Sequence, residues 1–77
     1  MILAIDMDKY PTLSDESPPD GWNELMDKQL CPYVLKDIVK LYHEYGFDLY
    51  LHNVNNIQPT TEFDDVRVKI YFKKKKV

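Results

Sequence analysis

The sequence is poor in cysteine, in glycine and in long hydrophobic runs, and each scarcity excludes a class of protein. The lone Cys31 has no second cysteine in the chain to pair with, and small domains from oxidising compartments usually depend on two or more disulfides. We therefore expect a reducing, cytoplasmic location. No stretch approaches the ~20 apolar residues of a membrane-spanning helix. The first residues contain no basic leader, so we expect no signal peptide.

Length and composition indicate one small folded domain. A chain of 77 residues leaves no room for a second core, and a hydrophobic content of 44% is too high for a disordered protein. The net charge of −3 is unevenly distributed, because residues 1–31 hold seven acids against two bases and residues 32–77 hold six acids against eight bases. Such a charge distribution indicates what kind of partner the protein can bind, and it does not indicate the fold.

The clearest predicted element is an amphipathic helix over about residues 32–45. Pro32 suits the first helical position, because its fixed backbone torsion already has a helical value. Gly46 stands where helices commonly end in a left-handed residue. Apolar side chains recur at helical spacing, and polar ones occupy the opposite side. The apolar set is Val34, Leu35, Ile38, Val39, Leu41, Tyr42 and Tyr45.

Strands are predicted on both sides of this helix. Apolar and polar residues alternate over 47–52 and again over 66–72, which is the period of a half-buried strand. The short apolar run at 2–5 suits a strand that is covered on both faces. Residues 22–30, in contrast, have apolar side chains at helix-like spacing after Asp20, so they are predicted as one or two helical turns that Asp20 caps.

Together these elements predict an α+β fold, namely a small two-layer β-α-β-β domain in which the helix packs on a three-stranded mixed sheet. The strands at 2–5 and 47–52 are expected to pair in parallel across a right-handed crossover, and the strand at 66–72 to pair antiparallel with the second. Residues 9–21 contain three prolines and are predicted as a long acidic loop. Residues 73–77 are predicted as a basic tail. Loops as long as 9–21 are commonly functional or disordered.

The acidic loop and the residues after it form the first candidate site. Carboxylates interleaved with aromatic side chains can oppose a basic surface on a partner protein, because the charges steer association and the rings supply contact area. The predicted function is therefore a non-enzymatic binding or regulatory protein that acts by protein–protein contact: an inhibitor, an antitoxin-like or immunity-like factor, or an accessory protein of a phage or mobile element. A solvated loop is the alternative interpretation. The candidate residues are Tyr10, Asp15, Glu16, Asp20, Trp22 and Glu24.

The third strand and the tail form a second candidate site, for nucleic acid. Aromatic side chains on a sheet can stack on bases while lysines neutralise phosphates. The net negative charge of the chain argues against this alternative. The competing interpretation is a solvated sheet face whose lysines keep an edge strand from pairing with another chain. The candidate residues are Tyr50, His52, Arg67, Lys69, Tyr71, Lys73, Lys74, Lys75 and Lys76.

An enzymatic alternative comes from two carboxylates at the end of the first predicted strand. Asp6 and Asp8 follow the apolar run at 2–5, and His52 and Asn53 follow a later strand. This arrangement resembles the opening of the haloacid dehalogenase-like phosphohydrolases, whose first motif is an apolar strand followed by Asp-x-Asp. The resemblance implies Asp6 as nucleophile, Asp8 as general acid and base, and Asn53 near the phosphate.

The chain differs from that family pattern at several positions. Lys9 and Tyr10 stand where the family continues its first motif with Gly-Thr, and His52 stands where the second motif has Ser or Thr. We therefore rank a reduced phosphohydrolase below both binding functions.

No metal site and no cofactor are predicted. His43, His52 and Cys31 lack the paired spacing of zinc ligands, and the two glycines do not form a phosphate-binding loop. The oligomeric state stays open.

Overall fold

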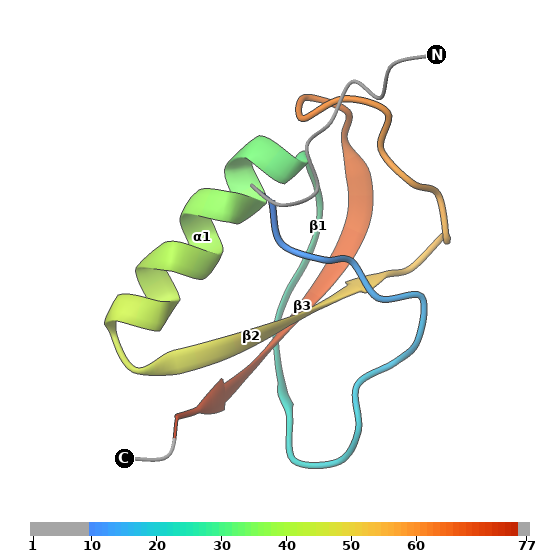
Figure 1. The fold of residues 1–77 in the computed structure, drawn as a ribbon. Helices are drawn as coiled ribbons and strands as arrows, with labels where there is room; N and C mark the ends of the chain where they lie inside the picture. The colour runs from blue at the N-terminus through green and yellow to red at the C-terminus, as the bar shows by residue number, and fades with distance from the viewer. Residues whose placement is uncertain (1–9, 76–77) are drawn as a thin grey trace.

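The computed structural model describes residues 10–75 and shows one helix packed on a three-stranded antiparallel sheet (Figure 1). The elements along the chain are β1 (Asn23–Leu30), α1 (Pro32–Glu44), β2 (Phe47–Asn53) and β3 (Val66–Lys74). The predicted α+β class is confirmed. The described elements also follow the order β-α-β-β, but their first strand is Asn23–Leu30, a segment predicted to be helical. No helix in the described part of the chain is long and apolar enough to cross a membrane.

The prediction of helical turns at residues 22–30 is wrong, because this segment forms the edge strand β1. It pairs antiparallel with β3, and the register shifts at a β-bulge between Glu24 and Met26. As a result, Leu25 and Met26 both pack against the core. Two adjacent core-facing residues break the alternation of a regular strand and imitate the spacing of an amphipathic helix.

β3 lies in the middle of the sheet and runs antiparallel to both neighbours, in the order β1-β3-β2. The antiparallel pairing of the second and third predicted strands is confirmed, whereas the expectation of a mixed sheet is wrong. In the chain, β1 precedes α1 and β2 follows it, and the two strands run in the same direction. They are not neighbours in the sheet, because β3 lies between them. The strand predicted at residues 2–5, with its parallel pairing, lies outside the described residues.

The core lies between α1 and the sheet face that it covers. Leu35 of α1, Leu51 of β2, and Val68 and Ile70 of β3 are almost completely buried and form one cluster. Full burial of such a side chain contributes roughly 1.5–3 kcal/mol, so the burial of these four side chains stabilises the packing of α1 on the sheet. The same side of β1 is covered less well, since Lys28, opposite Val68 in the register, is exposed.

The local chain chemistry sets both ends of α1. Cys31 has an extended backbone and Pro32 begins the helix, as predicted. At the other end, the N–H of Gly46 donates to the carbonyl oxygen of His43 at 3.1 Å, and Gly46 has a φ of +90°. A residue with a Cβ would be strained at this torsion, so the glycine permits the direct turn from α1 into β2.

The segment before β1 crosses over β2 and then turns away into β1 (Figure 1). Ser14 forms a single parallel bridge with β2. Its N–H donates to the carbonyl oxygen of Leu51 at 2.8 Å, and its own carbonyl oxygen accepts from the N–H of Asn53 at 2.7 Å. Asn53 is fully buried, and its side-chain amide donates to the carbonyl oxygen of Ile57 at 2.9 Å. Asn53 therefore ties this segment to the loop that follows β2.

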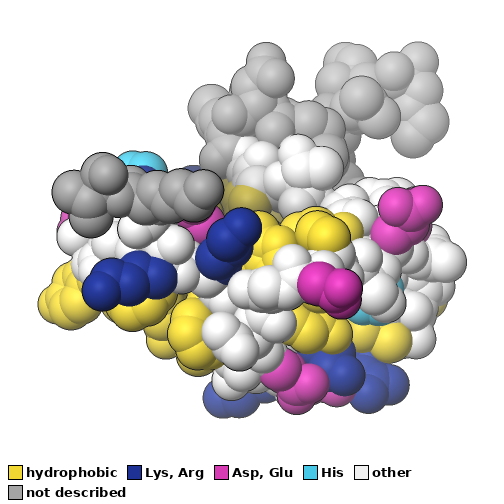
Figure 2. Space-filling model, turned by 90° about the horizontal axis from the view of Figure 1, so that it is seen from below, with side chains coloured by type: hydrophobic (Ala, Val, Ile, Leu, Met, Phe, Trp, Pro, Cys, Tyr) yellow, Lys and Arg dark blue, Asp and Glu magenta, His cyan; other side chains and the backbone are white. Residues whose placement is uncertain are grey.

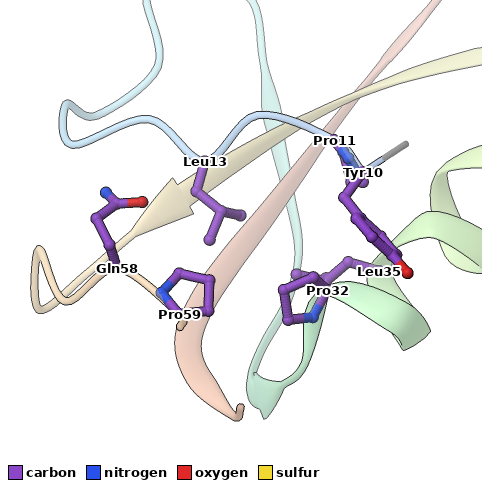
Figure 3. A pocket seen from close by; sticks show the side chains of 7 residues that line it. All are labelled: Tyr10, Pro11, Leu13, Pro32, Leu35, Gln58 and Pro59. Carbon is purple, nitrogen blue, oxygen red and sulfur yellow. The ribbon is translucent and has the colours of Figure 1, made fainter. Parts of the chain in front are cut away.

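A small pocket lies where this segment, the start of α1 and the loop after β2 meet (Figure 3). Its free volume is about 10 Å³, which is room for one water molecule at most. The pocket is therefore a place where three segments pack against one another, and it is too small to be a ligand site. Its lining residues are Tyr10, Pro11, Leu13, Pro32, Leu35, Gln58 and Pro59.

Candidate functional site

The sheet face that points away from α1, which we call the open face, carries most of the side chains predicted to be functional. The register places Glu24 opposite Tyr71 and Asp27 opposite Lys69, so acids of β1 lie beside bases of β3. The open face consists of Glu24, Asp27 and Gln29 from β1, Asp48, Tyr50 and His52 from β2, and Arg67, Lys69, Tyr71 and Lys73 from β3.

Two cations of the open face are bound by carboxylates of β1. Arg67 contacts Asp27 twice, with Nε 3.2 Å from Oδ1 and Nη2 3.0 Å from Oδ2. Lys69 Nζ lies 3.3 Å from Glu24 Oε1. The hydrogen bond from Arg67 lowers the pKa of Asp27, and the hydrogen bond to Glu24 raises the pKa of Lys69. Both cations therefore have partners within the fold.

Aromatic side chains form a row at one end of the open face. Trp22, directly before β1, packs on Tyr50 with ring centroids 5.7 Å apart, and Tyr50 meets Tyr71 edge-on at 6.4 Å. Lys73 Nζ lies 5.7 Å from the centre of the Trp22 ring, which is within the range of a cation–π contact. All three rings are half-buried, so the row fixes the position of Trp22.

Tyr50 also fixes the chain at Ser14. Its hydroxyl lies 2.7 Å from Ser14 Oγ and 2.9 Å from the carbonyl oxygen of Glu16. The N–H of Glu16 donates to Ser14 Oγ at 3.2 Å, which closes a small side-chain-to-backbone turn. Residues 14–22 are thus held to the sheet at both ends, by Ser14 and by Trp22, and we call them the anchored loop.

The anchored loop presents its carboxylates to solvent. Asp15, Glu16 and Asp20 are exposed, and no cation among residues 10–75 lies within ion-pair distance of them. They differ in this respect from Glu24 and Asp27, which pair with β3. The anchored loop therefore carries a group of negative charges that have no ion-pair partner within the described part of the chain, and both ends of the loop are fixed.

The structure brings together four of the six residues predicted for partner contact. Glu24 instead lies in β1 and pairs with Lys69. Tyr10 lies apart from the group, near the start of α1, where Lys36 Nζ is 5.6 Å from its ring centre. The four residues that share the anchored loop are Asp15, Glu16, Asp20 and Trp22.

The lysines predicted to bind nucleic acid do not share one surface. Lys73 lies on the open face. Lys74 lies opposite Phe47 in the register, at a position that belongs to the sheet face covered by α1. Lys75 contacts His43 of α1. Lys76 lies outside the described residues. The other residues of this predicted set do lie on the open face: Tyr50, His52, Arg67, Lys69 and Tyr71.

The predicted phosphohydrolase site is only partly described by the structure. Asp6 and Asp8 lie outside the described residues. Asn53, which the resemblance places near a phosphate, is fully buried and hydrogen-bonded to the loop after β2. Among residues 10–75, no three His, Cys, Asp or Glu side chains are arranged to hold a metal ion.

Sequence reasoning missed Ser14 and Asp27. No local pattern marks Ser14, because its contact with Tyr50 joins residues 36 positions apart. From Met26 to Leu30, after the bulge, residues alternate between the core side and the open face. This alternation could have indicated that Asp27 lies on the open face. That alternation is obscured by Lys28 at a core-side position.

No protein-family model matches this chain, and searches of curated proteins and of solved structures find no match. The functional interpretation therefore depends on the geometry of this molecule. That geometry defines a small α+β domain whose open face contains two ion pairs between β1 and β3. The carboxylates of its anchored loop are exposed and form no ion pair within residues 10–75.

Proposed function

We propose that this protein is a non-enzymatic binding protein that acts in the cytoplasm by protein–protein contact, and that its partner presents a basic surface to the anchored loop. The observation that carries the proposal is the contrast between paired and unpaired carboxylates. Glu24 and Asp27 are ion-paired to β3, whereas Asp15, Glu16 and Asp20 are exposed and, within the described residues, have no cation beside them.

The two fixed ends of the loop support this proposal. A loop that is already ordered in the free protein loses less conformational entropy when it binds. Neighbouring charges of one sign attract a surface of the opposite sign over several ångströms and raise the rate of encounter. Trp22, half-buried at the end of the loop, adds an aromatic side chain of the kind that is common at the energetic centre of interfaces.

A surface of this kind suits a protein that covers a basic functional region of its partner. Inhibitors, antitoxin-like factors and immunity-like factors work in this way, and an accessory protein of a phage or mobile element could use the same chemistry. The shared expectation is that binding weakens as salt is added, because the loop charges are exposed and open to screening.

Nucleic-acid binding is the alternative that the geometry supports less well. Arg67 and Lys69 already contact carboxylates, and a phosphate would have to displace those partners. Lys75 lies against α1, away from Lys73 on the open face. A gel shift at low salt separates the two functions: the proposal expects no retained DNA or RNA, and retention that Lys73→Glu abolishes would overturn it.

The main test is affinity capture from an extract of the cells in which the protein is made. The bait is compared with a loop-neutral variant, Asp15→Asn/Glu16→Gln/Asp20→Asn. The matched control carries the same three chemical changes elsewhere, as Asp48→Asn/Glu62→Gln/Asp65→Asn. We expect wild type and control to retain the same basic partner, and the loop-neutral variant to lose it.

Two results would contradict the proposal. One is a captured partner that the loop-neutral variant retains as well as wild type does. The other is equal loss in the loop-neutral and control variants, because overall charge rather than the anchored loop would then govern binding.

A further inference from the structure

α1 and the residue after it carry a second apolar stripe, in which only Ile38 also packs against the buried core cluster. Val34, Ile38, Leu41 and Tyr45 follow one another at intervals of four, three and four residues, the spacing of the contact positions in a helix–helix pair. Val34, Leu41 and Tyr45 have exposed fractions of 38%, 51% and 74%, and Ile38 is half-buried. We call these four residues the helix seam.

The helix seam borders a groove. An open hollow of about 240 Å³ lies against its C-terminal half and is lined by Leu41, Tyr42, Tyr45 and Phe47. A second hollow of about 80 Å³ is lined by Leu25, Tyr42, Phe47 and Phe72. The hollows share Tyr42 and Phe47, so they adjoin each other, and Leu25 places the second one between α1 and β1. We call the two hollows together the groove between α1 and β1. Figure 2 shows hydrophobic side chains at the surface of the left end of the molecule, the end where α1 passes into β2 in Figure 1.

This groove exists because one helix is too narrow for the sheet. A helix is about 10 Å wide and covers about two strands spaced about 4.8 Å apart. The buried cluster joins α1 to β2 and β3, and the same side of β1 is left with half-buried Leu25 and Met26 and exposed Lys28. A second helix would fit beside α1, with the helix seam as its side wall and β1 beneath it.

Acidic residues border the helix seam on the side away from the sheet. Asp37 and Glu44 are seven residues apart, so they lie on the same side of α1. Both are exposed, and neither forms an ion pair with any residue between 10 and 75. Two copies of α1 packed along their seams around a two-fold axis would place Asp37 of one copy beside Glu44 of the other. This repulsion disfavours a second copy of the chain as the occupant.

We propose that the groove between α1 and β1 binds an amphipathic α-helix of a partner protein. The apolar stripe of that helix packs on the helix seam, and its lysine or arginine residues pair with Asp37 and Glu44. The mode is that of a helix in a hydrophobic groove, with anchors every three to four residues. The surface lies on the side of the sheet opposite the open face, so the inference stands independently of the function proposed for the anchored loop.

Two synthetic helical peptides test this inference on the full chain. Both carry the same leucine stripe at intervals of three and four residues; one is bordered by lysines and the other by glutamates. Binding is measured by NMR titration, which reports the affinity and the amides that move. We expect the lysine-bordered peptide to bind about threefold to tenfold more tightly, because it gains two exposed ion pairs, and to shift amides of α1 and β1.

Variants make the result specific. Asp37→Lys/Glu44→Lys should invert the preference between the peptides. Leu41→Ser should weaken binding of both about tenfold or more, because a leucine contact is lost, and Val34→Ser serves as a second variant if Leu41→Ser unfolds. Ile57→Ser is the matched control, since Ile57 is 61% exposed in the loop after β2, and it should bind both peptides as wild type does.

Three results would overturn the inference. The first is equal binding of the two peptides, and the second is equal loss in Leu41→Ser and Ile57→Ser, which would indicate unspecific adhesion. The third concerns the second copy. If sedimentation shows a wild-type dimer that Leu41→Ser converts to a monomer, then the occupant of the groove is another copy of this chain.

Discussion

The hydroxyl group of Tyr50 holds the anchored loop to the open face, and Tyr50→Phe tests this role by removing a single atom. The hydroxyl lies 2.7 Å from Ser14 Oγ and 2.9 Å from the carbonyl oxygen of Glu16. A hydrogen bond of this kind contributes about 0.5–1.5 kcal/mol net. The ring remains, so the contact with Trp22 persists. We expect the free energy of unfolding to fall by about 1 kcal/mol, which lowers Tm by about 4–8 °C for a domain of this size.

The matched control is Tyr71→Phe. Tyr71 is half-buried on the same face and packs on Tyr50, but within residues 10–75 its hydroxyl makes no hydrogen bond, so its removal should leave Tm nearly unchanged. Amide hydrogen exchange gives a local readout, because the N–H of Asn53 donates to Ser14 and should exchange faster in Tyr50→Phe alone. An unchanged Tm in Tyr50→Phe, or an equal fall in Tyr71→Phe, would refute the reasoning.

Three further predictions concern the ion pairs and the scaffold. Because Arg67 lowers the pKa of Asp27, their contact stabilises the fold above the ordinary carboxyl pKa, and this contribution is lost as the pH falls below about 4. Asp27→Asn should therefore lower Tm near neutral pH, and its difference from wild type should shrink in acid; a difference independent of pH would contradict this. Gly46→Ala should cost about 1–2 kcal/mol in urea unfolding through its torsion alone, since φ is +90° and no atom lies within 4 Å of the added Cβ; an unchanged midpoint would count against it. Leu35→Ala should cost about 2–5 kcal/mol because Leu35 is fully buried, whereas Leu41→Ala at an exposed position should melt close to wild type by circular dichroism, and equal losses would be inconsistent with the described core.

The helix and the last two strands were predictable from the sequence because each repeats one period without interruption. Pro32 and Gly46 mark the two ends of α1 by their backbone torsions, and both effects are local. The alternation in β2 and β3 records which side of each strand is buried, so it also indicated that an open face exists.

β1 was not predictable in the same way, because a bulge and an exposed charge disturb its period. Leu25 and Met26 are adjacent and both pack against the core, while Lys28 occupies a core-side position at the poorly covered edge. With β1 taken as helical, the partners of Arg67 and Lys69 could not be found. The cations of β3 consequently resembled a free basic surface, which is what suggested nucleic acid.

The candidate site was only partly predictable, for a different reason. The charges of Asp15, Glu16 and Asp20 are visible in the sequence, but their significance depends on which other carboxylates are neutralised by the fold. That distinction follows from pairing across the sheet, as does the anchoring of the loop through Ser14 and Tyr50. Long-range contacts of this kind leave no periodic trace in a single sequence.

The most direct test of the proposed function is an NMR map of the surface that a partner covers. The isotope-labelled chain is titrated with the basic protein that wild type captures and the loop-neutral variant does not. The account predicts that amide signals of residues 14–22 shift or broaden first, that those of the loop after β2 do not, and that added salt reverses the change. Shifts confined to β3 and Lys73–Lys75, with residues 14–22 unaffected, would contradict it.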